Sequence, residues 1–461
     1  MRVLQVLSSR VVYTLLSFIL IVGGSYLAIQ YARGGWRVTN TGIVANTGML
    51  NANSFPTGAQ VFINDRLITA TDDTVYLQPD TYRVRIVKEG YSPWVKDLTV
   101  QGQLVTQTNA LLFPIAPSIT PLTVTGAVNV HPSPDGQKIL FFTDQAGTAA
   151  RNGLYVLDLN SNFLSLQSGA RQLTDAPAGW ELAEADIIWS PDSSELMILT
   201  ETREVLIGAD KKVNLAEQKD IAFQKSDILS TWEKDIYLRE QQFLARFPEE
   251  IQQIATQSAG NVYLSPDKKR LLYTATAAAT LSDDLIPPVP AANTQPEERE
   301  LMIGGIYIYD REEDRNFRLA TARPATEEDE EETDVTKTLT AALTQKALLH
   351  YEPIASLEAS LAAFTRLQAT NSAETARNFA NYYSSLHYNS LQWFPNSKHI
   401  LFINEGKIQI MEYDGYNVTT VYSGPFANNF VYPWPDGSKL IIQTSFSPDS
   451  PPNLYAIDLR R

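Results

Sequence analysis

A short polar turn followed by an apolar run occurs five times along the chain. The first copy is SPDGQKILFF at residues 133–142, and the others begin at residues 190, 265, 394 and 434. A short apolar strand precedes each turn, and a third strand often follows. Strands that are apolar on both faces must be covered on both faces. Repeated antiparallel meanders that cover one another predict a β-propeller.

The residue types in this turn have defined conformational roles. Serine takes the first position, proline fixes φ at the second, aspartate suits the third, and glycine accepts a positive φ at the fourth. The repeated aspartates could suggest a ring of metal ligands, but the turn explains them and each stands on a separate blade. We therefore predict structural turns, with no metal, cofactor or catalytic residues. The predicted turn residues are Ser133, Pro134, Asp135, Gly136, Ser190, Pro191, Asp192, Ser265, Pro266, Asp267, Pro395, Asn396, Pro435, Asp436 and Gly437.

The spacing of the turns predicts where the propeller, over 115–461, is interrupted. Five blades are clear, and a sixth could come from the proline-rich lead-in after Phe113 or from an insertion. One insertion, at about 215–257, contains an apolar helical stripe that includes Leu238 and is broken at Pro248. The other, at about 322–385, contains the acidic run EEDEEETD and Ala/Leu-rich helical segments. These insertions predict helices added to the propeller.

The N-terminal segment contains a long apolar run. Residues 11–32 carry no charge, and a bilayer core needs about 20 apolar residues in a helix. We predict a cytoplasmic stub over 1–10, a transmembrane signal anchor over 11–32 and a spacer over 33–49. The alternative is a cleaved signal peptide, with Gly23 and Ser25 as small residues near the cleavage site. The expected location is a single pass through the cell membrane, with the bulk extracytoplasmic or at the cell surface.

Period-two alternation predicts a small β-sandwich over 50–114, built from antiparallel strands. The region contains the tetrapeptide Pro56, Thr57, Gly58 and Ala59, the L-x-P-x-x-Y of 77–82, and a hairpin at 88–91. With these features it resembles the PEGA domain, although Thr57 replaces the usual acidic residue. The resemblance implies a structural or adhesive module outside the cytoplasm.

The five turn-and-strand copies resemble the blades of TolB-like propellers over about 120–461. The fourth copy departs from the Asp-Gly form with Asn396-Ser397, which is still turn chemistry. The predicted fold class is therefore mainly β: an N-terminal transmembrane helix, a PEGA-type β-sandwich, and a β-propeller with helical insertions.

The net charge and the motifs exclude several classes of partner and of catalytic site. The formal net charge is −15, and nucleic acid needs a basic surface, so we expect no nucleic-acid partner. The chain has no cysteine, which excludes disulfides and a cysteine nucleophile. None of its four histidines lies in H-E-x-x-H, and it has neither G-x-S-x-G nor a phosphate-binding loop. These absences favour a protein that is not an enzyme.

We therefore predict a membrane-anchored extracytoplasmic scaffold whose propeller binds a protein or a cell-envelope polymer. The alternative is a surface polysaccharide hydrolase or lyase with a carboxylate site on the propeller face, because propeller carboxylates meet in space rather than along the chain. That alternative requires Asp and Glu to gather in a central depression. A sensor that signals through the membrane is weaker, since only a ten-residue stub would lie inside.

Overall fold

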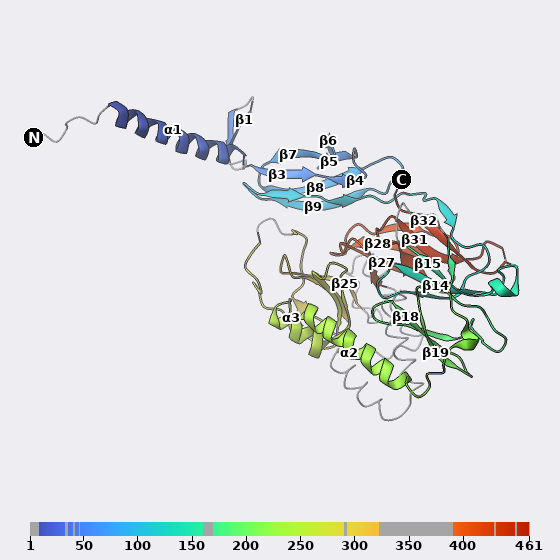
Figure 1. Cartoon of the computed structure of the whole chain (residues 1–461). Helices are drawn as coiled ribbons and strands as arrows, with labels where there is room; N and C mark the ends of the chain where they lie inside the picture. The colour runs from blue at the N-terminus through green and yellow to red at the C-terminus, as the bar shows by residue number, and fades with distance from the viewer. Residues whose placement is uncertain are drawn as a thin grey trace, which may run out of the picture. The chain divides into compact units, whose positions relative to one another are not determined.

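The structure is a computed structural model that describes residues 9–32, 36–39, 42–45, 47–159, 169–289, 293–321, 391–427, 430–447 and 450–460 (Figure 1). It divides into two units, Met1–Leu112 with Val289–Gln295, and Phe113–Pro288 with Pro296–Arg461. The predicted insertion at 322–385, with its acidic run, and residues 1–8 of the predicted stub lie outside the described residues.

The first described element is helix α1 (Ser9–Ala32), and the hairpin of β1 (Trp36–Thr39) and β2 (Gly42–Ala45) follows it. Among the described residues, no helix combines the length and the apolar character that a bilayer crossing requires. This finding overturns the predicted transmembrane signal anchor and the predicted single-pass location in the cell membrane.

The first unit is a small β-sandwich. One sheet has the order β10-β3-β7, a second has the order β6-β5-β8-β9, and β11 pairs with β4. The strands are β3 (Gly48–Ala52), β4 (Ser54–Phe55), β5 (Gln60–Ile63), β6 (Arg66–Ala70), β7 (Asp73–Leu77), β8 (Asp80–Val87), β9 (Trp94–Val100), β10 (Val105–Gln107) and β11 (Ala110–Leu111).

Alternate residues of these strands face one shared core, as the period-two pattern requires. Leu50 from one sheet and Val61, Val84 and Trp94 from the other are buried there. Two pairings differ from the predicted antiparallel order, because β10 runs parallel to β3 and β11 parallel to β4. Local alternation predicts a strand but not its direction, which depends on how the intervening chain crosses the sandwich.

Among the described residues, the second unit has five antiparallel sheets of three or four strands that follow one another along the chain, besides one two-stranded pair (Figure 1). We number them sheets 1 to 5 by their first hairpins. Sheet 1 has β13 (Val128–Pro132), β14 (Lys138–Thr143), β15 (Gly153–Asp158) and β16 (Arg171–Gln172); sheet 2 has β17 (Asp186–Trp189), β18 (Glu195–Leu199) and β19 (Glu204–Gly208); sheet 3 has β20 (Ala259–Leu264), β21 (Arg270–Ala275), β24 (Gly305–Asp310) and β25 (Arg315–Thr321); sheet 4 has β26 (Leu391–Trp393), β27 (His399–Asn404), β28 (Lys407–Glu412) and β29 (Thr419–Tyr422); sheet 5 has β12 (Ile119–Pro121), β30 (Val431–Pro433), β31 (Lys439–Thr444) and β32 (Asn453–Asp458).

Neighbouring sheets share apolar cores, which is why their second strands are apolar throughout. Sheets 5 and 1 share one core, sheets 1 and 2 another, and sheets 3 and 4 a third. Strand β12, from the start of this unit, pairs with β32, from its end. The first and last segments of the unit are therefore held in one sheet.

The predicted fold class needs correction. The described residues form a mainly β chain of several separate sheets, with no helix able to cross a membrane. The error came from reading the uncharged run of 11–32 as a membrane span. Each of the five sequence motifs joins two consecutive strands of one of the five sheets.

A helical segment lies between sheets 2 and 3 in the sequence. It consists of α2 (Lys225–Leu244), α3 (Glu249–Gln253) and a π-helical turn (Ile254–Ser258), and Pro248 is the N-cap of α3. Leu229, Trp232 and Ile236 of α2 pack on sheet 2. Leu238, which we expected in the apolar stripe, is 48% exposed because the buried face follows residues 229, 232 and 236 instead. The remaining short elements are η1 (Ala149–Arg151), η2 (Leu215–Glu217), β22 (Ala279–Thr280) and β23 (Glu300–Leu301).

Candidate functional site: the cavities beside the five turns

The five turns share one backbone geometry. In each, the N–H of the fourth residue donates to the carbonyl of the first, over N···O distances of 2.7–3.0 Å. The fourth residue has a φ between 61° and 72° in every copy. Glycine adopts this region freely, whereas other residues pay about 1–2 kcal/mol. The fourth residues are Gly136, Ser193, Lys268, Ser397 and Gly437.

The third residue of each turn binds its own turn. Asp135 Oδ1 accepts from the N–H of Gln137 at 3.0 Å, and Asn396 Oδ1 accepts from the N–H of Lys398 at 3.0 Å. Asp192, Asp267 and Asp436 repeat this contact. Hydrogen bonds from Ser190 and Ser194 lower the pKa of Asp192. Among the described residues, the structure brings no three His, Asp or Glu side chains together in a metal-binding arrangement.

The tetrapeptide of the first unit also has a structural role, because hydrogen bonds to other parts of the unit hold it in place. It lies between β4 and β5, where the N–H of Gly58, at φ 72°, donates to Thr71 O at 3.0 Å. Thr71 N donates to Ala59 O at 2.8 Å, and Ala59 is fully buried. Lys88 Nζ donates to Thr57 O at 2.7 Å, and the peptide bond before Pro56 is cis. Every polar contact here is internal to the fold.

The prolines of all five turns line two adjoining cavities. The first cavity, of about 430 Å³, is lined by the turns of sheets 1, 3, 4 and 5 and by the first strands of sheets 3, 4 and 5. The second, of about 440 Å³, is lined by the turns of sheets 1, 2 and 3 and by α2. Both include Pro134, Asp135, Tyr263, Leu264 and Lys268. Turn residues from all five sheets therefore line these two cavities, which we call together the hollow.

Two junctions between sheets are closed by the same three hydrogen bonds. Between sheets 1 and 2, Asp135 N donates to Ser193 Oγ at 3.0 Å, Lys138 Nζ donates to Ser193 O at 3.1 Å, and Trp189 Nε1 donates to His131 O at 3.2 Å. Between sheets 3 and 4, the same contacts join Asp267 N and Ser397 Oγ at 2.9 Å, Arg270 Nη1 and Ser397 O at 3.0 Å, and Trp393 Nε1 and Tyr263 O at 3.2 Å.

The junction between sheets 2 and 3 has a different residue at each of these three positions. Glu195 stands where Lys138 and Arg270 stand, and its carboxylate donates no hydrogen bond. Lys268 stands where the two junction serines stand, and an ammonium group accepts none. Leu264 replaces the tryptophan. The second cavity lies here, and we call this place the open junction.

Helix α2 supplies the other wall of the open junction. Its Arg239 Nη1 donates to Pro191 O at 3.2 Å, and its Phe243 ring lies 5.3 Å from Lys268 Nζ. Burial lowers the pKa of Lys268, while the charge of Glu240 opposes that effect and Arg239 adds to it. Two cations and three carboxylates, from Asp135, Asp192 and Glu240, therefore face the second cavity.

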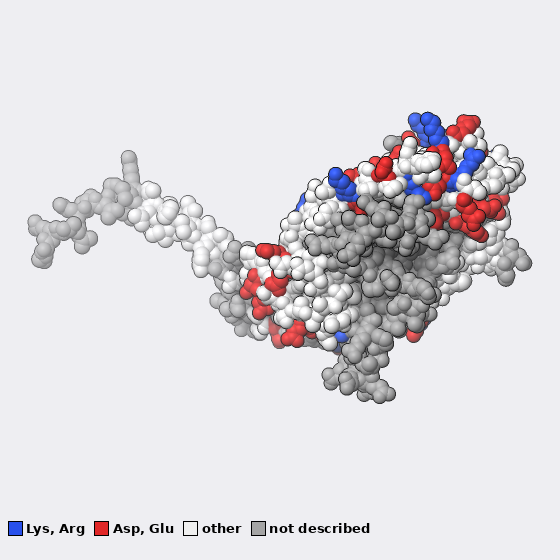
Figure 2. Space-filling view, turned by 90° about the horizontal axis from the view of Figure 1, so that it is seen from below, with Lys and Arg blue, Asp and Glu red and all other residues white. Residues whose placement is uncertain are grey.

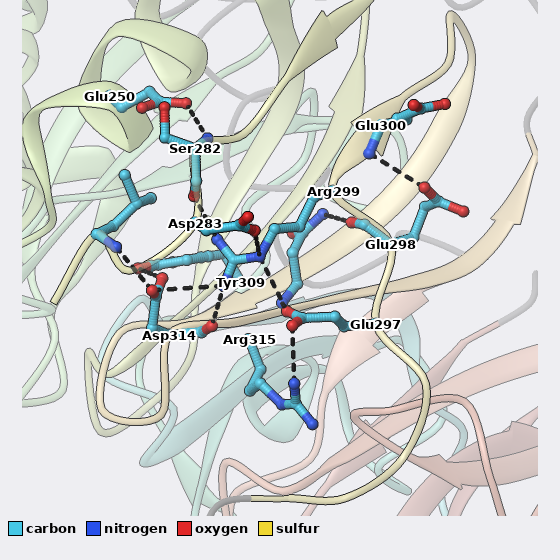
Figure 3. A network of polar contacts seen from close by, with 12 residues as sticks. Glu250, Ser282, Asp283, Glu297, Glu298, Arg299, Glu300, Tyr309, Asp314 and Arg315 are labelled. Carbon is cyan, nitrogen blue, oxygen red and sulfur yellow. Dashed lines mark hydrogen bonds and ion pairs between the residues drawn. The ribbon is translucent and has the colours of Figure 1, made fainter. Parts of the chain in front are cut away.

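A second polar cluster secures the proline-rich loop of sheet 3 (Figure 3). Arg299 lies at its centre, 3.3 Å from Glu297, 3.4 Å from Asp314 and 3.6 Å from Asp283. Tyr309 Oη donates to Asp314 Oδ1 at 2.8 Å. The carboxylates converge on a guanidinium group, so this cluster is a structural clamp rather than a cation site.

Charged side chains on the face shown in Figure 2 occur in scattered groups. Asp and Glu gather in several places, with Lys and Arg beside some of them, and no broad basic area covers the visible face.

The sequence analysis assigned the motif residues a structural role in turns, and it did not point to either cavity or to the role of the fourth residue. The signal was present in the alignment of the five copies with one another. Lys268 is a long cation at a position that is otherwise Gly or Ser, and Glu195 is an acid where three other copies carry Lys or Arg and one carries His. His131 and His399 lie near turns in sheets 1 and 4, and the other two histidines lie outside the described residues.

Residues 47–114 match the PEGA domain family. No curated protein matches the chain. Among solved structures, a TolB from Agrobacterium tumefaciens is 12% identical, with 74% of this chain and 83% of that chain covered and a TM-score of 0.21. TolB from Acinetobacter baumannii is 10% identical, with 82% of this chain and 59% of that chain covered and a TM-score of 0.20. An oligogalacturonate lyase in complex with manganese is 10% identical, with 90% and 91% covered and a TM-score of 0.20. The chain thus contains a PEGA domain and has TolB-like neighbours among solved structures.

Proposed function

We propose that the chain is a non-enzymatic binding scaffold whose second unit holds a protein or cell-envelope polymer in the hollow beside the five turns. The PEGA match favours a periplasmic or surface setting for such a scaffold. The observation that carries the proposal is the convergence of all five turn prolines on two adjoining cavities.

The lining of the first cavity suits an extended chain. Tyr263, Trp393 and Tyr432 provide aromatic surface, and prolines from four turns provide rigid apolar edges. Gln137 and Gln392 provide amide groups, and the amide of Gln392 also donates to Val431 O at 2.8 Å. Binding sites for organic ligands combine apolar walls with a few polar groups in this way.

The carboxylates of the hollow argue against the hydrolase or lyase alternative. Among the described residues lining the first cavity, Asp135 alone is acidic, and its turn holds it through Ser133 Oγ at 2.5 Å. In the second cavity, hydrogen bonds from Ser190 and Ser194 lower the pKa of Asp192. A general acid needs the opposite shift, towards neutral pH.

A blocked-cavity variant tests the proposal. The full chain is immobilised and incubated with cell-envelope extract, and retained protein and polymer are identified by mass spectrometry and sugar analysis. Gln137→Trp places a bulky ring at the wall of the first cavity, and we expect it to reduce retention at least tenfold. Among the described residues, Gln137 forms hydrogen bonds only through its backbone, so the fold should be kept.

Gln145→Trp is the matched control. Gln145 is exposed beyond the other end of the same strand, β14, so the same substitution there leaves the cavity open. Equal retention by both variants would refute the hollow as the binding surface. Release of shortened polymer fragments by the wild-type chain would instead favour the hydrolase or lyase.

A further inference from the structure

The first cavity combines aromatic rings with proline rings. Tyr263, Trp393 and Tyr432, from the first hairpin strands of sheets 3, 4 and 5, line it, and prolines from four turns and Pro433 of β30 lie beside them. The face of an aromatic ring is partly negative and attracts weakly polarised C–H groups. The volume of about 430 Å³ lies in the range of pockets that hold small organic ligands. These walls therefore suit a ligand with flat C–H surfaces.

The charges of the first cavity balance. Among the described residues that line it, Asp135 and Lys268 are the charged ones, with one charge of each sign. An anion would be attracted by Lys268 and repelled by Asp135, and a cation would meet the reverse. The first cavity thus gains nothing from a charged ligand and favours a neutral one.

The hydrogen-bonding groups of the walls define what the ligand must offer. Two donors are already used inside the fold, because Trp393 Nε1 donates to Tyr263 O at 3.2 Å and Gln392 Nε2 donates to Val431 O at 2.8 Å. Gln392 Oε1 accepts no hydrogen bond from a described residue.

Asp135 also has an acceptor to spare. Its Oδ1 takes the bonds from Ser133 and from the N–H of Gln137, whereas its Oδ2 lies 4.0 Å from Lys138 Nζ and accepts no hydrogen bond from a described residue. The side-chain amide of Gln137 forms no hydrogen bond within the described part of the chain and can both donate and accept. The unused groups of the walls therefore favour a ligand that donates hydrogen bonds.

Two neutral ligand classes suit aromatic and proline walls, and these donors and acceptors distinguish them. A proline-rich peptide docks in aromatic grooves, but it has few N–H groups to give to spare acceptors. A saccharide has hydroxyl groups that donate and accept around the edge of a ring whose face carries C–H groups. The saccharide therefore satisfies both the ring faces and the spare acceptors.

We infer that the first cavity binds a neutral saccharide, with Tyr263 and Trp393 packing on a sugar ring and with Asp135, Gln137 and Gln392 accepting from its hydroxyl groups. The inference rests on the proposed function, because it names the class of polymer that enters the hollow. It makes neither an acidic polysaccharide nor a proline-rich peptide the preferred ligand.

The test uses the full chain and probes that differ in charge and in hydrogen-bonding groups. Cellotriose, maltotriose and chitotriose are the neutral saccharides, trigalacturonate is the acidic one, and N-acetyl-hexaproline amide is the peptide. Binding is measured by calorimetry. At least one neutral trisaccharide should bind about tenfold more tightly than trigalacturonate and the hexaproline probe.

Variants of the walls connect this preference to the first cavity. Tyr263→Leu removes a ring but keeps an apolar side chain, and it should weaken saccharide binding about tenfold, whereas Tyr263→Phe should stay within about threefold of the wild type. Gln137→Met removes an amide at similar length and should weaken binding about threefold.

Tyr416→Leu is the matched control. Tyr416 is 38% exposed between β28 and β29 and lines neither cavity, so the same substitution there should leave binding unchanged. Circular dichroism checks that each variant is folded.

Three results would overturn the inference: no binding of any neutral trisaccharide, equal or tighter binding of trigalacturonate or the hexaproline probe, or equal effects of Tyr263→Leu and Tyr416→Leu. If no trisaccharide binds while Gln137→Trp still reduces retention from extract, the inference fails and the proposed function stands. If Gln137→Trp retains as much as the wild type, the proposed function fails as well.

Discussion

The junction between sheets 3 and 4 and the open junction between sheets 2 and 3 are built around the same turn. Only the first of them is closed by hydrogen bonds between the sheets. In the first, Ser397 accepts one hydrogen bond through its side chain and one through its carbonyl, and Trp393 donates a third. In the second, Lys268 and Leu264 occupy the matching positions and the gap holds a cavity and helix α2. A repeated turn thus sets where two sheets meet, whereas the residues beside it decide whether they close.

The same comparison shows what the fourth residue of the turn does. Where serine is the fourth residue, its hydroxyl group accepts a hydrogen bond from the backbone of the neighbouring sheet. Where lysine is the fourth residue, its side chain lies over the Phe243 ring of helix α2 instead. The closed junctions should therefore contribute more to stability than the open junction.

The largest effect is expected at the closed junction between sheets 3 and 4. Arg270 Nη2 lies 2.7 Å from Asp310 Oδ2, and Asp310 is fully buried. Arg270→Met would leave that carboxylate without its cation and would remove the bond to Ser397 O, at a cost of about 3–5 kcal/mol in the free energy of unfolding. Urea denaturation followed by circular dichroism measures this change.

Lys439→Met is the control at the same position of sheet 5. Its ion pair with Asp458, at 3.4 Å, is partly exposed, so its loss should cost less than about 1 kcal/mol. Equal losses for the two variants would show that Arg270, with its buried ion pair and its bond across the junction, adds nothing beyond an ordinary surface pair.

Exchanging the fourth residues should have a smaller and unequal effect. Ser193→Lys removes the acceptor of Asp135 N and brings a second ammonium group close to Lys138, so we expect a loss of about 1–2 kcal/mol. Lys268→Ser should change stability by less than about 0.5 kcal/mol, because no sheet contact depends on Lys268. Thermal and urea unfolding of both variants measure the difference, and matching losses would contradict it.

The smallest effect concerns acid. Burial lowers the pKa of His131 to about 4, so the folded chain keeps this imidazole neutral. The unfolded chain takes up the proton near pH 6.5, so stability is lost as the pH falls from about 6.5 towards 4. Because His131 is partly exposed, we expect it to contribute about 1 kcal/mol of loss between pH 7 and pH 5.

His131→Gln should remove that part of the pH dependence. The carbonyl of His131 still accepts from Trp189, so the closed junction between sheets 1 and 2 is kept. Urea unfolding at pH 7 and pH 5 compares the two chains. An identical loss in both would show that His131 takes no part in the acid response.

Much of the local structure could be predicted from the sequence, because it depends on neighbouring residues. The turns at Pro134, Pro191, Pro266, Pro395 and Pro435 follow from the conformational preferences of proline, aspartate and glycine. The strands around them follow from continuous apolar runs. Reading 11–32 as a membrane span was wrong, since an uncharged run alone does not establish one.

The direction of β10 and β11, the buried face of α2, and the two cavities could not be predicted in this way. Each depends on which residues from distant segments meet. Glu195, Leu264 and Lys268 are ordinary residues in their own strands and turns. Their effect on the junction arises only when sheets 2 and 3 lie side by side with α2 against them.

The five turns and the apolar strands therefore follow from local sequence, because short-range sterics and hydrogen bonding act within a few residues. The tertiary structure alone decided which junctions close, where the hollow lies and which charges face it. Those outcomes depend on hydrogen bonds between residues more than fifty positions apart, such as Asp135 with Ser193. The sequence around one residue does not indicate which distant residue it will contact.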